Sequence, residues 1–97
     1  MKIFLVDEAS EELTEAVSFY EEQVKGLGLD LEYEIRQCFS LILENPELVA
    51  KDDKGVRKFL VNRFPFIIHY TIEKDIIHVW AIAHAKRRPG YWKSRKG

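Results

Sequence analysis

The spacing of apolar residues changes at Gly55, and this change is the strongest constraint on the fold. Before it, apolar residues recur at steps of three and four, the period of amphipathic helices. After it, segments rich in β-branched and aromatic residues alternate with short polar turns, which predicts strands joined as hairpins. The expected helices span residues 10–25 and 29–44, and the expected strands span residues 56–61, 64–73 and 76–83. A chain that separates helices from strands in this way is typical of the α+β class.

Polar and glycine residues mark the expected helix ends. Ser10 is a candidate N-cap, because acidic residues crowd the turn around it. The Lys25–Gly28 stretch ends the first helix with glycine, and Asn45-Pro46 ends the second. The two helices then form a helical hairpin. Residues 2–6 predict one more strand, whose partner in the sheet the pattern leaves open.

We therefore expect one domain, residues 1–97, with the element order β-α-α-β-β-β. In this two-layer α+β fold, an N-terminal strand and a helical hairpin pack with an antiparallel sheet.

The net charge of −1 conceals a sharp division of charge along the chain. Residues 1–53 hold 14 Asp and Glu against 4 Lys and Arg, whereas residues 54–97 hold 2 against 11. In one interpretation, the helices simply carry solvated acidic faces and the rest is basic by coincidence. In the other, the C-terminal half meets a polyanion or an acidic protein segment.

The most distinctive local feature is the stretch His84–Trp92. It contains a histidine, three consecutive cations, a Pro-Gly turn and two aromatic residues. Cations neutralise phosphates, aromatic rings stack on bases or anchor a partner, and histidine exchanges a proton near neutral pH. Alternatively, Tyr91 and Trp92 fold back onto the core and the cations belong to a solvated tail.

Before residue 84, the basic half of the chain holds two arginines, Arg57 and Arg63. Strand alternation puts Arg57 and Lys58 on opposite faces, so only one of them can face a given site. Arg57 is the more interesting candidate, since it follows Gly55-Val56 where the strand begins. Its alternative is a surface ion pair with the acidic helices.

Several classes of function find no support in the sequence. No apolar run approaches the roughly 20 residues that span a bilayer, so we expect no membrane association. The histidines and Cys38 lack zinc-like spacing, and no glycine-rich phosphate loop or nucleophile elbow is present, so we expect neither metal nor cofactor. Cys38 falls on an apolar stripe and fits inert core in a reducing cytosol, which indicates a cytoplasmic protein.

His69 and His78 lie within strands, where histidines are usually packed or surface residues. The glutamates are dispersed along the helices, and we expect them to be solvated.

Short motifs in a fixed order run through nearly the whole chain. They are Ala9–Leu13 with Ala16 and Phe19-Tyr20, Gly26–Gly28, Asn45-Pro46, Gly55–Lys58, Arg63–Tyr70, and Ala83-His84 with Arg87–Trp92. In order and spacing the sequence resembles the RelE/ParE superfamily of toxins, also described as plasmid-stabilisation proteins. The resemblance implies a helical hairpin on an antiparallel sheet, in agreement with the expected fold.

The resemblance also implies the toxin of a type II toxin–antitoxin system, neutralised by a cognate antitoxin. Such an antitoxin wraps the toxin with its C-terminal segment and binds operator DNA with its N-terminal part, so the toxin meets DNA only indirectly. One branch of the superfamily comprises mRNA interferases, which cut mRNA on the ribosome without a metal. The ParE-like branch inhibits DNA gyrase and lacks a nuclease site.

Under the nuclease hypothesis, His84 or Tyr91 moves a proton and Arg57 holds phosphate. However, Ile67 stands where the mRNA-cutting prototype carries an arginine, and losing that cation removes transition-state stabilisation commonly worth a few kcal/mol. We therefore favour the gyrase-directed function, with an mRNA endoribonuclease or a non-toxic partner-binding protein as alternatives. In either toxin, the residues expected to bind target or phosphate are Arg63, Lys86, Arg87, Arg88 and Trp92.

Overall fold

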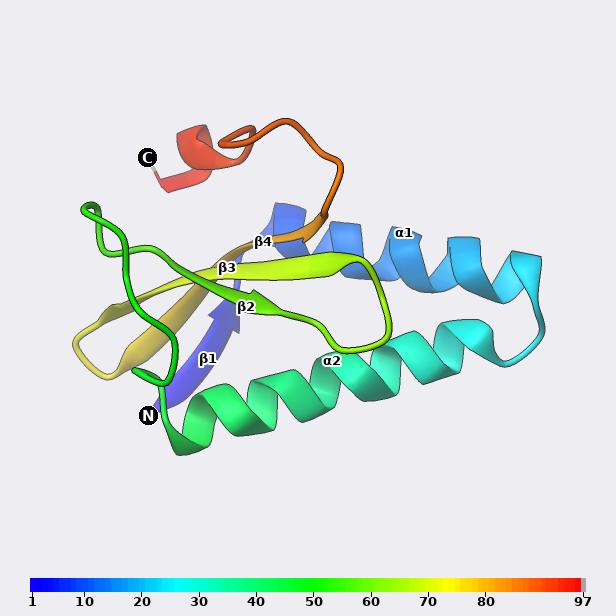
Figure 1. Ribbon diagram of the computed structural model, residues 1–97, viewed down its shortest axis with the longest axis horizontal. Helices are drawn as coiled ribbons and strands as arrows, with labels where there is room; N and C mark the ends of the chain where they lie inside the picture. Colours follow the sequence, from blue (N-terminus) through cyan, green and yellow to red (C-terminus); the bar gives the residue numbers. More distant parts are fainter. Residues whose placement is uncertain (97) are drawn as a thin grey trace.

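Two helices lie side by side against one face of a four-stranded sheet in the computed structural model, which describes residues 1–96 (Figure 1). The strand order across the sheet is β1-β4-β3-β2. The α+β class and the element order expected from the sequence are confirmed. The elements are β1 (Lys2–Leu5), α1 (Asp7–Gln23), α2 (Leu27–Glu44), β2 (Arg57–Leu60), β3 (Phe66–Glu73), β4 (Ile76–His84) and the short 3₁₀ helix η1 (Lys93–Lys96).

The sheet is mixed, which corrects the expectation of a wholly antiparallel one. The pairs β2–β3 and β3–β4 are antiparallel, but β1 runs parallel to β4, with Lys2 opposite Ile76 and Leu5 opposite Val79. Parallel neighbours require a long crossover connection, and the two helices provide it. The five-residue apolar run that predicted β1 carries no information about direction.

The first helix begins before Ser10, so the expected cap at that residue is wrong. α1 starts at Asp7, and the preceding Val6 provides no side-chain cap. The amide of Val6 donates to the carbonyl of Val79 (3.1 Å), so pairing with β4 continues to the first turn of α1. Sheet pairing therefore fixes where this helix begins, and Asp7 and Glu8 supply the acidic first turn that the helix dipole favours.

The turn between the helices depends on Glu21 of α1. Its carboxylate accepts the amides of Gly26 (2.8 Å) and Gly28 (2.9 Å), which satisfies donors at the start of α2. Gly26 has a φ of 89°, a left-handed conformation that suits glycine. Gly28 lies inside α2, where a Cβ atom would stand 2.4 Å from the carbonyl oxygen of Val17. Glycine at this position therefore lets the two helices approach closely.

The main core lies between the helices and the sheet. Tyr70 is fully buried there, and its hydroxyl donates to the carbonyl of Pro46 (2.8 Å). Cys38 is buried in the same core, as expected, and burial raises the pKa of its thiol. No helix within residues 1–96 has the length and apolarity needed to cross a membrane. Other members of the core are Ala9, Leu31, Ile35, Ile42, Val61, Phe64, Phe66, Ile68, Ile77, Val79 and Ile82.

A β-bulge in β4 interrupts the alternation of its side chains. Tyr70 pairs with Val79 and His69 pairs with Ala81, so Trp80 is an additional residue without a partner position on β3. The indole N–H of Trp80 donates to the hydroxyl of Thr71 (2.8 Å). The bulge explains the imperfect alternation of this strand in the sequence.

Candidate functional site

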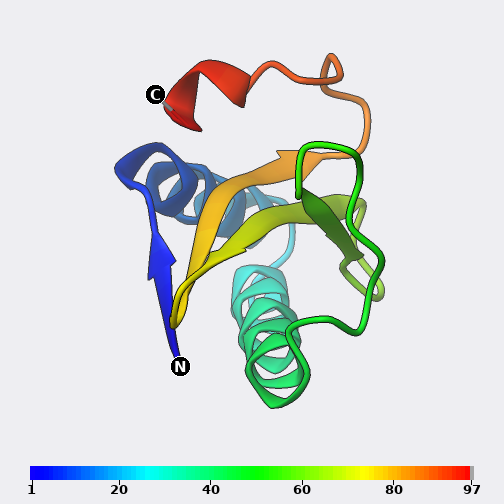
Figure 2. The ribbon, with the colours of Figure 1, turned by 90° about the vertical axis from the view of Figure 1, so that its left-hand side faces the viewer.

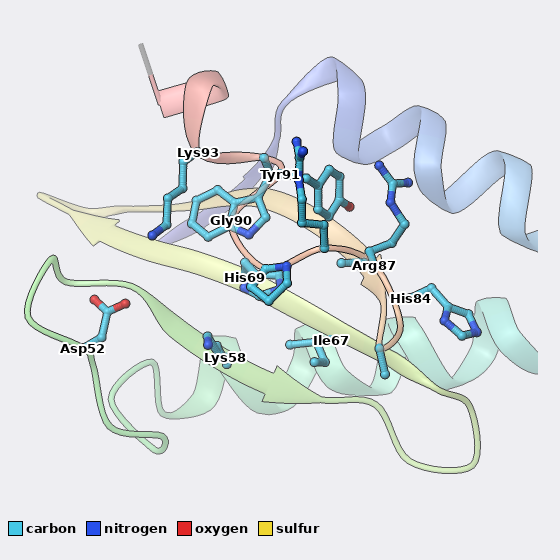
Figure 3. Close-up of a pocket in the computed structure, with 14 residues that line it drawn as sticks. Asp52, Lys58, Ile67, His69, His84, Arg87, Gly90, Tyr91 and Lys93 are labelled. Atoms are coloured by element: carbon cyan, nitrogen blue, oxygen red, sulfur yellow. The ribbon is translucent and has the colours of Figure 1, made fainter.

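The chain after β4, residues 85–96, turns back over the sheet face that the helices leave open (Figure 2). We call it the C-terminal segment. Trp92 anchors it in a small second core. A cavity of about 190 Å³ lies between this segment, β2 and β3. Its lining includes Asp52, Lys58, Ile67, His69, Ala83, His84, Arg87, Arg88, Gly90, Tyr91, Trp92 and Lys93 (Figure 3).

Strand register decides which of the two neighbouring cations on β2 reaches this pocket. Lys58 lies opposite His69, so both occupy the open face. Arg57 lies opposite Tyr70, whose side chain is in the main core, and is therefore on the helix face. Arg57 is buried there, donates to the carbonyl of Val49, and lies 3.8 Å from the Glu47 carboxylate. Lys58, rather than the favoured Arg57, lines the pocket.

His69 forms part of the pocket floor. Its ring packs against Trp92 with 5.0 Å between centroids. Burial lowers the pKa of His69 to about 4, and the Lys58 cation contributes, so the imidazole is neutral at physiological pH. Its Nδ1 has no hydrogen-bond partner among residues 1–96. The sequence predicted a packed or surface residue here. The signal that could have placed His69 in a site is its pairing with Lys58 across the β2–β3 hairpin.

Lys93 and Asp52 close one side of the pocket (Figure 3). The Asp52 carboxylate accepts the amides of Lys54 (2.8 Å) and Val56 (2.9 Å). These hydrogen bonds lower the pKa of Asp52, and the charges of Lys58 and Lys93 lower it further. Sequence reasoning missed Lys93, because nothing local to it shows that the chain folds back.

Gly90 allows that return. Its φ is 75°, and a Cβ atom there would lie 3.1 Å from Cε of Lys93. A side chain at this position would therefore be strained by the backbone and would crowd the lysine. Gly90 thus brings Lys93 to the pocket.

Glu12 of α1 holds the C-terminal segment in place. One carboxylate oxygen accepts the Ile82 amide (3.1 Å) and Nη1 of Arg95 (2.9 Å), and the other accepts the Tyr91 hydroxyl and Nη2 of Arg95 (3.2 Å). Arg95 also donates to the Trp80 carbonyl (3.0 Å). The interpretation of the glutamates as merely solvated is therefore wrong for Glu12, which joins residues far apart in the chain.

Tyr91 and Trp92 mainly hold the C-terminal segment against the rest of the protein. Burial raises the pKa of Tyr91 to about 12, and its hydrogen bond to Glu12 adds to the effect. The Arg87 guanidinium lies 3.9 Å from the centroid of the Tyr91 ring, a cation–π contact. Trp92 is only 3% exposed, so its expected contact with a target is not available in this conformation. The alternative in which both aromatics fold back describes them better.

His84 ends β4, at the opposite end of the pocket from Lys93 (Figure 3). Its Nδ1 accepts the Lys86 amide (3.1 Å), and its ring meets Phe66 edge-on with 5.5 Å between centroids. It is partly exposed and also lines a second groove with Phe19, Tyr20 and Arg87. Tyr91, the other candidate named for proton transfer, is also partly exposed, but its hydroxyl is hydrogen-bonded to Glu12.

The remaining expected cations are divided between two regions. Arg88 lines the pocket and Lys86 lies two positions before it in the chain, and both are exposed. Arg63 stands apart in the β2–β3 connection, where it pairs with α2 through Asp30 (3.8 Å) and Glu34 (3.3 Å). No group of three or more His, Cys, Asp or Glu residues in the described chain is arranged to hold a metal ion.

Comparisons with known proteins bear on the fold. No protein-family model matches the chain, and no curated protein matches it. A chain of the solved structure described as "Chromosomal ParDE TA system from P. aeruginosa" matches with a TM-score of 0.73. The match covers 87% of this chain and 95% of that one, at 18% sequence identity. This chain shares its fold with that chain of the ParDE structure. The architecture thus agrees with the resemblance seen in the sequence.

Proposed function

We propose that the chain is the toxin of a type II toxin–antitoxin system, kept inactive by a cognate antitoxin. The observation that carries this proposal is the shared fold with a chain of the P. aeruginosa ParDE structure, almost all of which is covered. The division of charge adds support, since the basic C-terminal segment offers an acidic protein segment a complementary surface.

Within that class we infer a ParE-like, gyrase-directed function. Of the residues that a nuclease was expected to use, His84 and Tyr91 line the same pocket, but Arg57 does not. Arg57 lies on the helix face, and the Tyr91 hydroxyl is engaged by Glu12 with a pKa of about 12. A general acid or base works best with a pKa near the operating pH. Ile67 lines the pocket where the cutting prototype of the resemblance carries a cation. Binding, rather than RNA cleavage, fits this arrangement.

One observation favours the alternative of a RelE-like mRNA endoribonuclease. His84 is partly exposed beside Arg87, which could hold a phosphate while the imidazole moves a proton. Such a reaction needs no cofactor, because the 2′-hydroxyl of the RNA can itself attack. A non-toxic, partner-binding role is the third candidate.

Controlled expression in a bacterium separates the three. We expect growth arrest with filamentation, altered DNA supercoiling and intact mRNA. Early mRNA cleavage at ribosomes that is lost in His84→Ala but kept in His78→Ala would establish the nuclease instead. A chain that leaves growth unaffected would support the partner-binding role.

The antitoxin is tested separately. We expect a small acidic or amphipathic protein, encoded next to this chain, to co-purify with it and to relieve the growth arrest. Charge-neutralising substitutions at Arg87 and Arg88 should weaken the complex, whereas Arg36→Gln on the exposed face of α2 should leave it intact. The absence of any such partner would contradict the proposal.

A further inference from the structure

Three nitrogen-bearing side chains from separate parts of the chain meet in the pocket under the C-terminal segment. Lys58 comes from β2, His69 from β3 and Lys93 from η1 (Figure 3). Neither the gyrase-directed function nor the nuclease alternative assigns them a role. Because these donors come from three elements and line one pocket, they favour a ligand that several donors can bind at once.

The charge around this pocket is positive. Lys58, Lys93, Arg87 and Arg88 line it, against a single carboxylate from Asp52. One Asp52 oxygen already accepts two backbone amides, which ties this carboxylate to its own turn. Asp52 therefore offsets part of the lysine charge and leaves an excess for an incoming anion.

His69 provides a second, independent observation in favour of a ligand at this pocket. It is 8% exposed and lines the pocket, yet its Nδ1 has no hydrogen-bond partner within the described chain. A buried polar atom left in this state is unfavourable. A neutral imidazole carries one N–H, which can donate to an anion's oxygen. An oxyanion seated between the lysines would lie against this ring, and it would satisfy Nδ1 if the ring turned that buried atom toward the pocket.

We propose that Lys58, His69 and Lys93 form a binding site for the phosphate group of a small phosphate monoester. The cavity of about 190 Å³ accommodates a phosphate and a modest substituent. It is smaller than the roughly 300–1,000 Å³ of ordinary small-molecule sites. The ammonium groups of Lys58 and Lys93 come from different elements and suit the dispersed oxygens of a phosphate, and the His69 ring lies beside them. Ile67, Ala83 and Trp92 give the substituent an apolar wall.

Occupancy would also fasten the C-terminal segment. Lys93 belongs to the segment, whereas Lys58 and His69 belong to the sheet. An anion held by all three bridges the two and adds to the attachment that Glu12 already provides at the other side. The site is independent of the proposed toxin function, because phosphate binding is expected whether or not gyrase is the target.

The test is a titration of the full-length chain followed by NMR, with the His69 ring resonances as the local probe. Inorganic phosphate, adenosine 5′-monophosphate and adenosine are added separately at constant ionic strength. We expect the two phosphate-bearing probes to shift the His69 resonances with saturation, and adenosine to leave them unchanged. Tighter binding of the nucleotide would identify a phosphate monoester, and equal binding would identify the free phosphate ion.

Matched lysine variants keep the test specific. Lys58→Gln and Lys93→Gln each remove one charge-assisted contact and should weaken binding by about tenfold or more. Lys74→Gln removes the same charge from the exposed β3–β4 turn and should change nothing. The proposal is overturned if no phosphate-bearing probe shifts His69, or if Lys74→Gln weakens binding as much as the pocket variants. Retained amide spectra show that each variant is folded.

Discussion

The two faces of the sheet are held in different ways. The helix face packs against α1 and α2 through a continuous apolar core that includes Leu31, Ile35 and Ile68, each no more than 1% exposed. The open face has a small cluster around Trp92, next to a pocket with charged and polar walls. The C-terminal segment, which covers this face, is hydrogen-bonded to one carboxylate, that of Glu12.

The helix face therefore provides most of the stability, whereas the segment over the open face can change conformation. Apolar burial over many side chains makes the helix face the source of global stability. The C-terminal segment depends on few contacts, and segments of that kind open locally without unfolding the whole domain. Arg87, Arg88 and Lys93 therefore lie on the part of the molecule that can rearrange, whereas Lys58 and His69 belong to the sheet.

The largest effect is expected on the helix face. Ile68→Ala empties a fully buried position and should lower the free energy of unfolding by about 2–5 kcal/mol, as measured by urea denaturation. Leu60→Ala on the neighbouring strand is the matched control, since Leu60 is 70% exposed and should change stability by less than about 0.5 kcal/mol. If both substitutions lowered the free energy of unfolding equally, the helix face would not be the main source of stability.

The next largest effect is a pH dependence that arises on the open face. His69 has a folded-state pKa of about 4, below its usual 6.5, because burial disfavours the cation. The unfolded chain therefore binds the proton more readily, and stability is full above pH 6.5 and falls as pH drops toward 4. The loss should reach about 3 kcal/mol.

Urea denaturation at several pH values, with His69→Leu as the comparison, isolates this contribution from the carboxylates. The wild-type protein should lose more stability than the variant between pH 6.5 and pH 4. Parallel curves for the two proteins would exclude His69 as the cause.

A smaller and local effect is expected from Glu12→Ala. Removal of this acceptor takes a hydrogen bond from the Ile82 amide, the Tyr91 hydroxyl and Arg95, which keeps only its bond to the Trp80 carbonyl among those described, at a cost of about 1–3 kcal/mol. Hydrogen exchange should become faster across the C-terminal segment while α2 keeps its protection. Glu11→Ala, at the exposed neighbouring position, should leave both unchanged. A uniform rise in exchange would mean that the segment and the core unfold together.

The smallest effect concerns the β3–β4 turn, which both faces share. Lys74 has a φ of 57°, a left-handed conformation that is unfavourable for a residue with a Cβ atom. Lys74→Gly should relieve this backbone strain and raise the free energy of unfolding by a few tenths to about 1 kcal/mol, visible as a higher Tm. Asp75→Gly, next to it at an ordinary φ, should lower the Tm. A lower Tm for both would show that the turn is not strained at Lys74.

Much of the architecture was predictable because it follows from short-range periodicity. The helical spacing of Leu31, Ile35 and Ile42 and the strand character of residues 66–73 appear in the structure as expected. The candidate site was predictable only in part. The sequence identified the basic aromatic segment, but it favoured Arg57 over Lys58 and passed over Lys93.

The sequence by itself determined the α+β class, the order of the elements and the concentration of positive charge in the second half. These properties are local, since the period of apolar residues and the count of charges need no knowledge of the fold. Only the tertiary structure decided the direction of β1, the bulge at Trp80 and the burial of Trp92. It also brought Tyr91 to Glu12, 79 positions earlier in the chain. Such contacts depend on how separate elements pack, and the spacing of residues along the chain does not encode that packing.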